Sequence, residues 1–130
     1  MPATGTRDHD EVTIISGNPE TLDGLQGYLQ GAGFAVRSTR DVGACATMTS
    51  KRTLAIILFP DDFRCEGVVA ALAQLEKLRA PALPILVTAH PQRFANLRNE
   101  EVLIVPRPVW GWTILDALRA HSERRTRNDA

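Results

Sequence analysis

Short apolar runs alternate with segments of helical periodicity along the central part of the chain. The run Leu54–Phe59 contains no polar residue, which is typical of a strand that is buried on both faces of a sheet. The other runs are shorter, rich in β-branched residues and bounded by turn residues, which also favours strands. The predicted strands are residues 12–15, 34–37, 54–59, 84–87 and 102–105.

A helical segment follows each predicted strand. Pro19 suits the first turn of the first helix, Leu22, Leu25 and Leu29 form its apolar face, and Gly31 and Gly33 end it. Asp41 is a good N-cap for a second, short helix. A third helix, a short fourth helix at residues 92–97 and a last helix complete the prediction. The residues that we expect on inner helix faces are Val42, Cys45 and Met48 in the second helix, Val68, Leu72, Leu75 and Leu78 in the third, and Ile114, Leu115 and Leu118 in the last.

Five successive strand–helix units predict one α/β domain, because right-handed crossovers produce a parallel sheet with helices on both faces. We expect a flavodoxin-like, doubly wound (βα)5 fold with strand order 2-1-3-4-5 and a short fourth helix. Residues 11–121 form this domain. Residues 1–10 are expected to be a flexible arm, and residues 122–130 a polar tail that frays.

Composition and charge exclude several classes of function. Fifteen basic residues balance fifteen acidic residues without a basic stripe, which disfavours nucleic-acid binding. Neither a membrane span nor a signal peptide is recognisable, so we expect a cytoplasmic protein that does not enter membranes. Cys45 and Cys65 are then reduced thiols and are interpreted as small buried residues, with no metal site around them.

Three segments at the ends of predicted strands resemble the receiver domains of response regulators. Pro84–Ala89 resembles the family's apolar fourth strand with its Thr/Ser-Ala ending, and Val105–Pro108 resembles the Lys-Pro that ends the fifth. Ser16–Pro19 resembles the family's Asp-Asp-Glu-Pro with every acid replaced. The resemblance covers residues 11–121 and implies a signalling domain that is switched by phosphorylation.

The same resemblance implies that the phosphorylation pocket is degenerate. Receivers hold Mg²⁺ with two acids after the first strand, and Ser16 and Gly17 stand there. The phosphorylated aspartate aligns with Phe59, or with Leu58 if the strand slips by one residue. Thr88 matches the hydroxyl that binds phosphoryl oxygens, and Arg107 replaces the family's lysine.

Asp61 and Asp62 follow the missing acceptor by two and three residues. One of them could fold back into the pocket as a relocated acceptor. The interpretation favoured by the sequence is that they are solvated loop acids, or that one pairs with Arg107. Arg107 needs an anion in either case, because an unpaired buried guanidinium is costly.

The signalling face of the resembled family is built here from the short fourth helix, the fifth strand and the last helix. Ile104 takes the position of a switch aromatic on the fifth strand. Trp110 and Trp112 lie two residues apart at the start of the last helix, so they cannot both point into one core. We expect one to pack inward, near Leu115, and the other to be at least half exposed as an anchor for a partner.

The sequence therefore favours a phosphorylation-independent, receiver-like adaptor with no enzymatic activity and no cofactor. Its partner would be a protein of a signalling, motility or regulatory complex, or a second copy bound through the face just described. A receiver that is phosphorylated at Asp61 or Asp62 is one alternative. A flavodoxin-like binder of a phosphate-containing ligand is the other, since Ser16, Asn18 and Thr21 lie at a helix N-terminus.

Overall fold

The computed structural model describes residues 11–78, 81–97, 102–107 and 111–129. Within these residues the strands form one sheet in which every neighbouring pair is parallel, in the order β2-β1-β3-β4-β5. The predicted fold and strand order are confirmed. The strands are β1 (Glu11–Ile15), β2 (Ala35–Thr39), β3 (Thr53–Leu58), β4 (Leu83–Thr88) and β5 (Leu103–Pro106).

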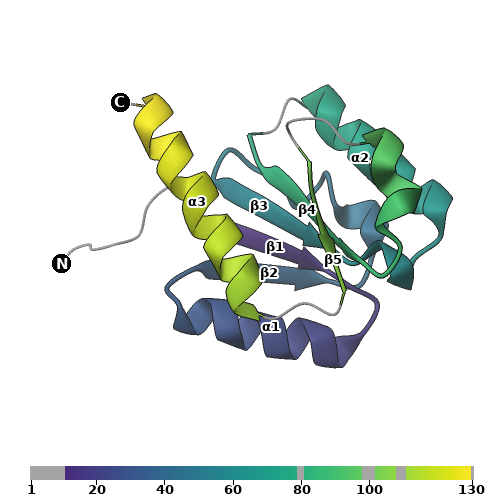
Figure 1. The fold of residues 1–130 in the computed structure, drawn as a ribbon, viewed down its shortest axis with the longest axis horizontal. Helices are drawn as coiled ribbons and strands as arrows, with labels where there is room; N and C mark the ends of the chain where they lie inside the picture. The colour runs from purple at the N-terminus through teal and green to yellow at the C-terminus, as the bar shows by residue number, and fades with distance from the viewer. Residues whose placement is uncertain (1–10, 79–80, 98–101, 108–110, 130) are drawn as a thin grey trace.

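Helices cover the two faces of the sheet (Figure 1). The α-helices are α1 (Pro19–Gly31), α2 (Cys65–Leu78) and α3 (Gly111–Asp129), and the 3-10 turns are η1 (Val42–Ala44), η2 (Pro60–Asp62) and η3 (Pro91–Leu97). Along β3, Ala55 and Ile57 pack into the core with α1 and α3, whereas Ile56 and Leu58 pack with α2 and η3. This alternation is the period of two that places successive strand residues on opposite faces. Both faces of β3 are therefore buried, as its apolar run predicts.

The first helix begins and ends at the residues that the sequence indicates. The Asn18 side chain accepts a hydrogen bond from the Glu20 N–H at 2.9 Å, and Pro19 occupies the first turn. Gly33 adopts a positive φ of 102°, which favours glycine, and lets the chain reverse so that the Phe34 N–H donates to the Leu29 carbonyl at 3.1 Å. These local signals fix where the chain turns from α1 into β2.

Three expectations about burial and helix length are wrong. Cys65, the first residue of α2, is exposed, whereas Cys45 is buried, and this burial raises the pKa of the Cys45 thiol to about 11. Leu78 is 56% exposed at the last described position of α2, and Ala71 is buried in the inner face instead. The Asp41 side chain does cap a helix, but only the three-residue turn η1.

The end of the chain also differs from the expectation. Helix α3 continues to Asp129, so the segment after Ser122 is helical where a frayed tail was predicted. Ser122 itself is buried, which shows that the helix still packs on the domain at this position. Ile114, Leu115 and Leu118 face the core as predicted, and the first ten residues lie outside the described part of the chain.

Candidate functional site

The carboxyl ends of the central strands meet at one edge of the sheet. Ile15 pairs with Leu58, and the chain after β3 stays in register because the Phe59 N–H donates to the Ile15 carbonyl at 3.0 Å. The Arg107 N–H donates to the Thr88 carbonyl at 2.9 Å, which ties the chain after β5 to the end of β4. The residues predicted from the strand endings are thus brought together.

Phe59 stands directly after β3, at the position that the resemblance aligns with the family's phosphorylated aspartate. Its side chain is 5% exposed and belongs to the core cluster that also contains the inner faces of α1 and α3. The guanidinium carbon of Arg107 lies 5.8 Å from the centre of the Phe59 ring, a cation–π arrangement. Leu58 is buried in the opposite core cluster. This position is part of the hydrophobic core.

The 3-10 turn η2 folds the chain back over the strand ends. Asp62 and Phe63 donate their N–H groups to the carbonyls of Phe59 and Pro60, both at 3.1 Å. Asp61 and Asp62 lie on this tight turn, and their carboxylates reach different strands. One reaches the end of β4 and the other reaches the end of β1.

The Asp61 carboxylate binds the end of β4 with both of its oxygens. Oδ1 accepts from the Thr88 hydroxyl at 2.6 Å, and Oδ2 accepts from the Ala89 N–H at 2.8 Å. Burial alone would raise the pKa of Asp61, but these hydrogen bonds and the electrostatic interactions with His90 and Arg107 outweigh burial and lower the pKa. Asp61 is therefore an ionised carboxylate that is held by donors.

Arg107 interacts with Asp61 through its charge, at a distance too long for a hydrogen bond. Its Nη1 atom lies 3.9 Å from Asp61 Oδ2, and its side chain is 40% exposed, against 19% for Asp61. An exposed ion pair at this distance contributes at most about 1 kcal/mol. The predicted pairing of Arg107 with one of the loop acids is confirmed, and the hydrogen bonds to Thr88 and Ala89 are the stronger part of the contact.

The Asp62 carboxylate binds the end of β1. Its Oδ2 atom accepts both from the Ser16 hydroxyl at 2.6 Å and from the Gly17 N–H at 3.1 Å. A Cβ on Gly17 would lie 3.3 Å from the Asp62 Cβ, so the absence of a side chain at Gly17 makes room for this approach. Ser16 Oγ also accepts from the Asn18 N–H at 3.1 Å, which leaves the start of α1 firmly attached to the loop.

The groups at the end of β1 do not fit a Mg²⁺ ion. Ser16 and Gly17 act here as O–H and N–H donors toward Asp62, whereas a hard cation needs several oxygen atoms that turn their lone pairs toward it. Asp62 brings one carboxylate to a position where the resembled family has two acids. The chemistry of the metal-dependent site is therefore not available from these groups.

Asp61 and Asp62 are exposed loop acids, one of which pairs with Arg107, as the sequence indicates; what the sequence did not indicate is that both carboxylates also bind strand ends. Sequence reasoning also missed the Ala89 N–H as a donor and His90 as an electrostatic neighbour of Asp61. A signal was present in the sequence: Ser16 and Gly17, which precede the first helix, carry no acid, and two acids follow the third strand directly after a proline. Whether these two acids reach the pocket depends on tertiary structure.

The lowered pKa of Asp61 predicts a loss of stability in acid. At a pH between the folded and unfolded pKa values the unfolded chain binds more protons. The contribution of Asp61 is thus present above its ordinary value of 3.8 and is lost as the pH falls through the lower, folded value. Urea midpoints measured from pH 6 downward should fall more steeply for the wild type than for Asp61→Asn. Asp23→Asn, which removes an exposed carboxylate of α1, should behave like the wild type; parallel curves for all three would contradict this assignment.

The fold of this chain is that of known receiver domains, although its sequence is distant from them. No protein-family model matches the sequence, and no curated protein matches it significantly. The signal receiver domain of an HD domain-containing protein from Pseudomonas fluorescens Pf-5 superposes with a TM-score of 0.74 at 18% identity, covering 99% of this chain and 98% of that one.

Two further solved structures lead to the same conclusion. A response regulator receiver domain protein from Clostridium thermocellum has a TM-score of 0.74 at 14% identity, covering 89% of this chain and 96% of its own. A CheY-like response regulator receiver domain protein from Methanospirillum hungatei JF-1 has a TM-score of 0.67 at 17% identity, covering 88% and 98%. The chain therefore has the fold of response-regulator receiver domains.

Proposed function

We propose that the protein is a phosphorylation-independent, receiver-like signalling module that acts through protein contacts and not as an enzyme. The observation that carries this proposal is the occupation of the pocket by the chain itself. The Thr88 hydroxyl and the Ala89 N–H, which would bind the oxygens of an incoming phosphoryl group, already bind Asp61. Phe59 supports the proposal because the acceptor position carries no carboxylate.

The geometry favours neither alternative function. Asp61 as a relocated acceptor would have to attack with oxygens that now receive hydrogen bonds, and it would withdraw the donors that stabilise the transferred group. For a phosphate-containing ligand at the start of α1, the Asp62 carboxylate places a negative charge on the Gly17 N–H where the phosphate would bind. Asn18 caps α1 without any ligand.

Acetyl phosphate with Mg²⁺ is expected to leave the intact mass of the protein unchanged, because no carboxylate occupies the acceptor position. Mass spectrometry under mildly acidic conditions, which preserve an acyl phosphate, is the measurement. A receiver domain with an intact acidic pocket serves as the positive control. An added phosphoryl mass that disappears in Asp61→Asn or in Asp62→Asn would refute the proposal.

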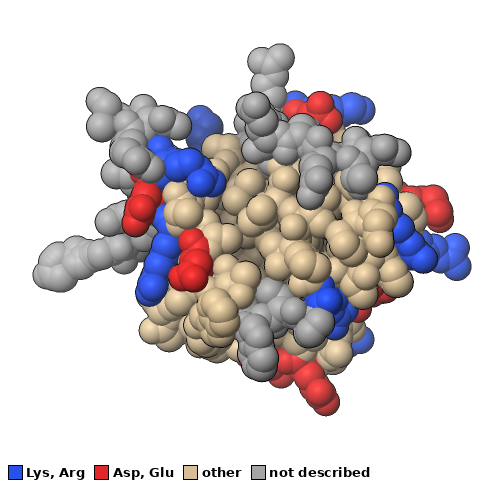
Figure 2. Space-filling model, viewed as in Figure 1, with Lys and Arg blue, Asp and Glu red and all other residues tan. Residues whose placement is uncertain are grey.

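The partner surface that we propose is the face formed by η3, β5 and α3. Figure 2 shows a broad area of uncharged side chains in the middle of this face, with charged residues mainly toward its margin. It includes a shallow groove of about 200 Å³ between strand and helix, lined by Leu83, Val102, Leu103, Ala117, Ala120 and Arg124. Trp112 is 58% exposed on the first turn of α3, as expected for one of the two tryptophans, and Trp110 lies outside the described residues. Ile104 is partly buried and packs against the core cluster that contains Phe94 of η3.

Replacing Trp112 with alanine should weaken association while leaving stability within about 0.5 kcal/mol of the wild type, as expected for an exposed position. The simplest association is a symmetric dimer, so sedimentation velocity over a range of concentrations is the measurement. Val69→Ala is the matched control, since Val69 is also exposed but lies on α2. Equal association of the two variants would exclude Trp112 from the interface.

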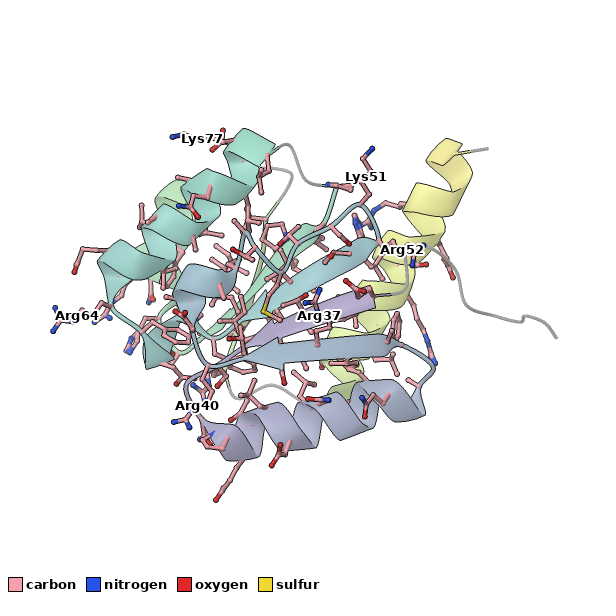
Figure 3. The ribbon with its side chains drawn as sticks, turned by 180° about the vertical axis from the view of Figure 1, so that it is seen from behind. Arg37, Arg40, Lys51, Arg52, Arg64 and Lys77 are labelled. Carbon is pink, nitrogen blue, oxygen red and sulfur yellow. The ribbon has the colours of Figure 1, made fainter. Side chains whose placement is uncertain are left out.

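We further propose that the partner is a protein in the cytoplasm. Figure 3 shows that the basic residues labelled on the opposite side are spread over that face and do not form one stripe. Arg37 among them pairs with Glu11 at 3.9 Å. Such a distribution gives no continuous track for a phosphate backbone. Within the described residues, none of the helices has the length and apolar character needed to cross a membrane.

A further inference from the structure

The donors around Asp61 form a compact binding site for an anion. A hydroxyl from Thr88, a backbone N–H from Ala89 and the guanidinium of Arg107 converge on one carboxylate. Thr88 is fully buried at the end of β4, so the sheet fixes the position of its hydroxyl oxygen. We name these three groups the anion cradle. Thr88 ends β4, Ala89 follows it, and Arg107 directly follows β5. The anion that fills the cradle, the Asp61 carboxylate, comes from η2, 27 residues away from Thr88 in the sequence.

We infer that Asp61 is a tethered ligand of this anion cradle: the chain carries its own anion in a site that would otherwise take a small oxyanion such as inorganic phosphate. The inference rests on the proposed function and specifies how the pocket is kept occupied. A carboxylate held on the same chain has a high effective concentration at the site, so a free anion does not displace it from the wild type. The domain is thereby held permanently in its anion-bound arrangement.

Occupation of the cradle is coupled to the proposed partner surface through Thr88. Its Oγ1 donates to Asp61 and also accepts from the His90 N–H at 2.9 Å. His90 in turn accepts the Arg93 N–H at its carbonyl, at 3.0 Å, within the turn that begins η3. Without Asp61 the hydroxyl loses the acceptor that fixes its orientation, and the hydrogen bond from His90 weakens. The start of η3 should therefore become less ordered when the cradle is empty.

Amide hydrogen exchange with a titration of inorganic phosphate tests this inference. In Asp61→Ala the amides of His90 and Arg93 should exchange faster than in the wild type, and phosphate should slow them again. At a phosphate concentration of about four times Kd the expected slowing is about five-fold. Chloride at matched ionic strength should have no such effect. The wild type and Asp62→Ala, which keeps the tethered Asp61, should not respond to phosphate.

A response of the same size in all three proteins, or in none of them, would overturn the inference. If Asp61→Ala does not fold in the absence of phosphate, the same titration is performed on Asp61→Ser. Folding of either variant that depends on added phosphate supports the inference, and failure of both to fold at any phosphate concentration contradicts it.

Phosphate binding here adds no covalent mass, so this result is independent of the acetyl phosphate experiment. A phosphorylated wild type would refute the proposed function, whereas an unresponsive Asp61→Ala with unchanged wild-type mass refutes only the tethered ligand.

Discussion

Asp61→Asn is expected to destabilise the domain by about 2 kcal/mol, whereas Asp62→Asn is expected to cost less than about 1 kcal/mol. The two substitutions remove the same charge from neighbouring residues of one turn. They differ in how the carboxylate is used. Asp61 accepts with both oxygens, from Thr88 and from Ala89, but Asp62 accepts both of its hydrogen bonds on Oδ2 alone.

An asparagine has one oxygen that can accept and one amide group that can only donate. At position 62 the remaining oxygen can replace Oδ2 and keep both hydrogen bonds. At position 61 the amide group faces either the Ala89 N–H, which then loses its acceptor, or the Thr88 hydroxyl, which can accept from it but loses the acceptor for its own proton. Urea denaturation at neutral pH measures both losses. Equal losses, or a larger loss for Asp62→Asn, would show that charge and not oxygen geometry holds the turn in place.

Phe59→Asp, which restores an aspartate at the acceptor position, is expected to destabilise the domain by about 4 kcal/mol or more. The substitution removes a buried ring from the core and replaces it with a carboxylate that has no water around it. The nearby guanidinium of Arg107 already faces Asp61, so it compensates the new charge only in part. We also expect no gain of phosphorylation, because the Mg²⁺ ligands are still missing at Ser16 and Gly17.

Phe59→Leu is the matched control, with an expected loss of about 1.5 kcal/mol, since it keeps an apolar side chain of similar reach. Thermal or urea unfolding compares the two variants, and the intact mass after treatment with acetyl phosphate and Mg²⁺ tests phosphorylation. Similar stability of Phe59→Asp and Phe59→Leu would mean that water or Arg107 solvates this position. A phosphoryl group on the aspartate variant would show that the pocket needs only its acceptor.

The order of the strands and the identity of the residues at their ends follow from the sequence. The unbroken apolar run of β3 and the capping residues Asn18 and Pro19 are local features, and local features fix strand ends and helix starts. The topology of parallel sheets then brings the ends of β1, β3, β4 and β5 to one edge. The resemblance to receiver domains added the roles at that edge: it implied that Thr88 and Arg107 share one pocket and that Ser16, Gly17 and Phe59 stand at positions where the family has carboxylates.

The tertiary structure alone decided where the side chains of Asp61 and Asp62 lie. Two acids after a strand are equally compatible with a solvated loop, and their partners Thr88 and Ser16 are 27 and 46 residues away. The sequence also could not determine which apolar residues at the helix ends are exposed. Cys65 and Leu78 fit the apolar pattern of α2, but they lie at its two ends and are exposed. Periodicity reports which face of a helix is apolar, whereas burial depends on what packs against each turn. The direction of a short polar side chain depends on the donors within its reach, and those donors come together only in the folded chain.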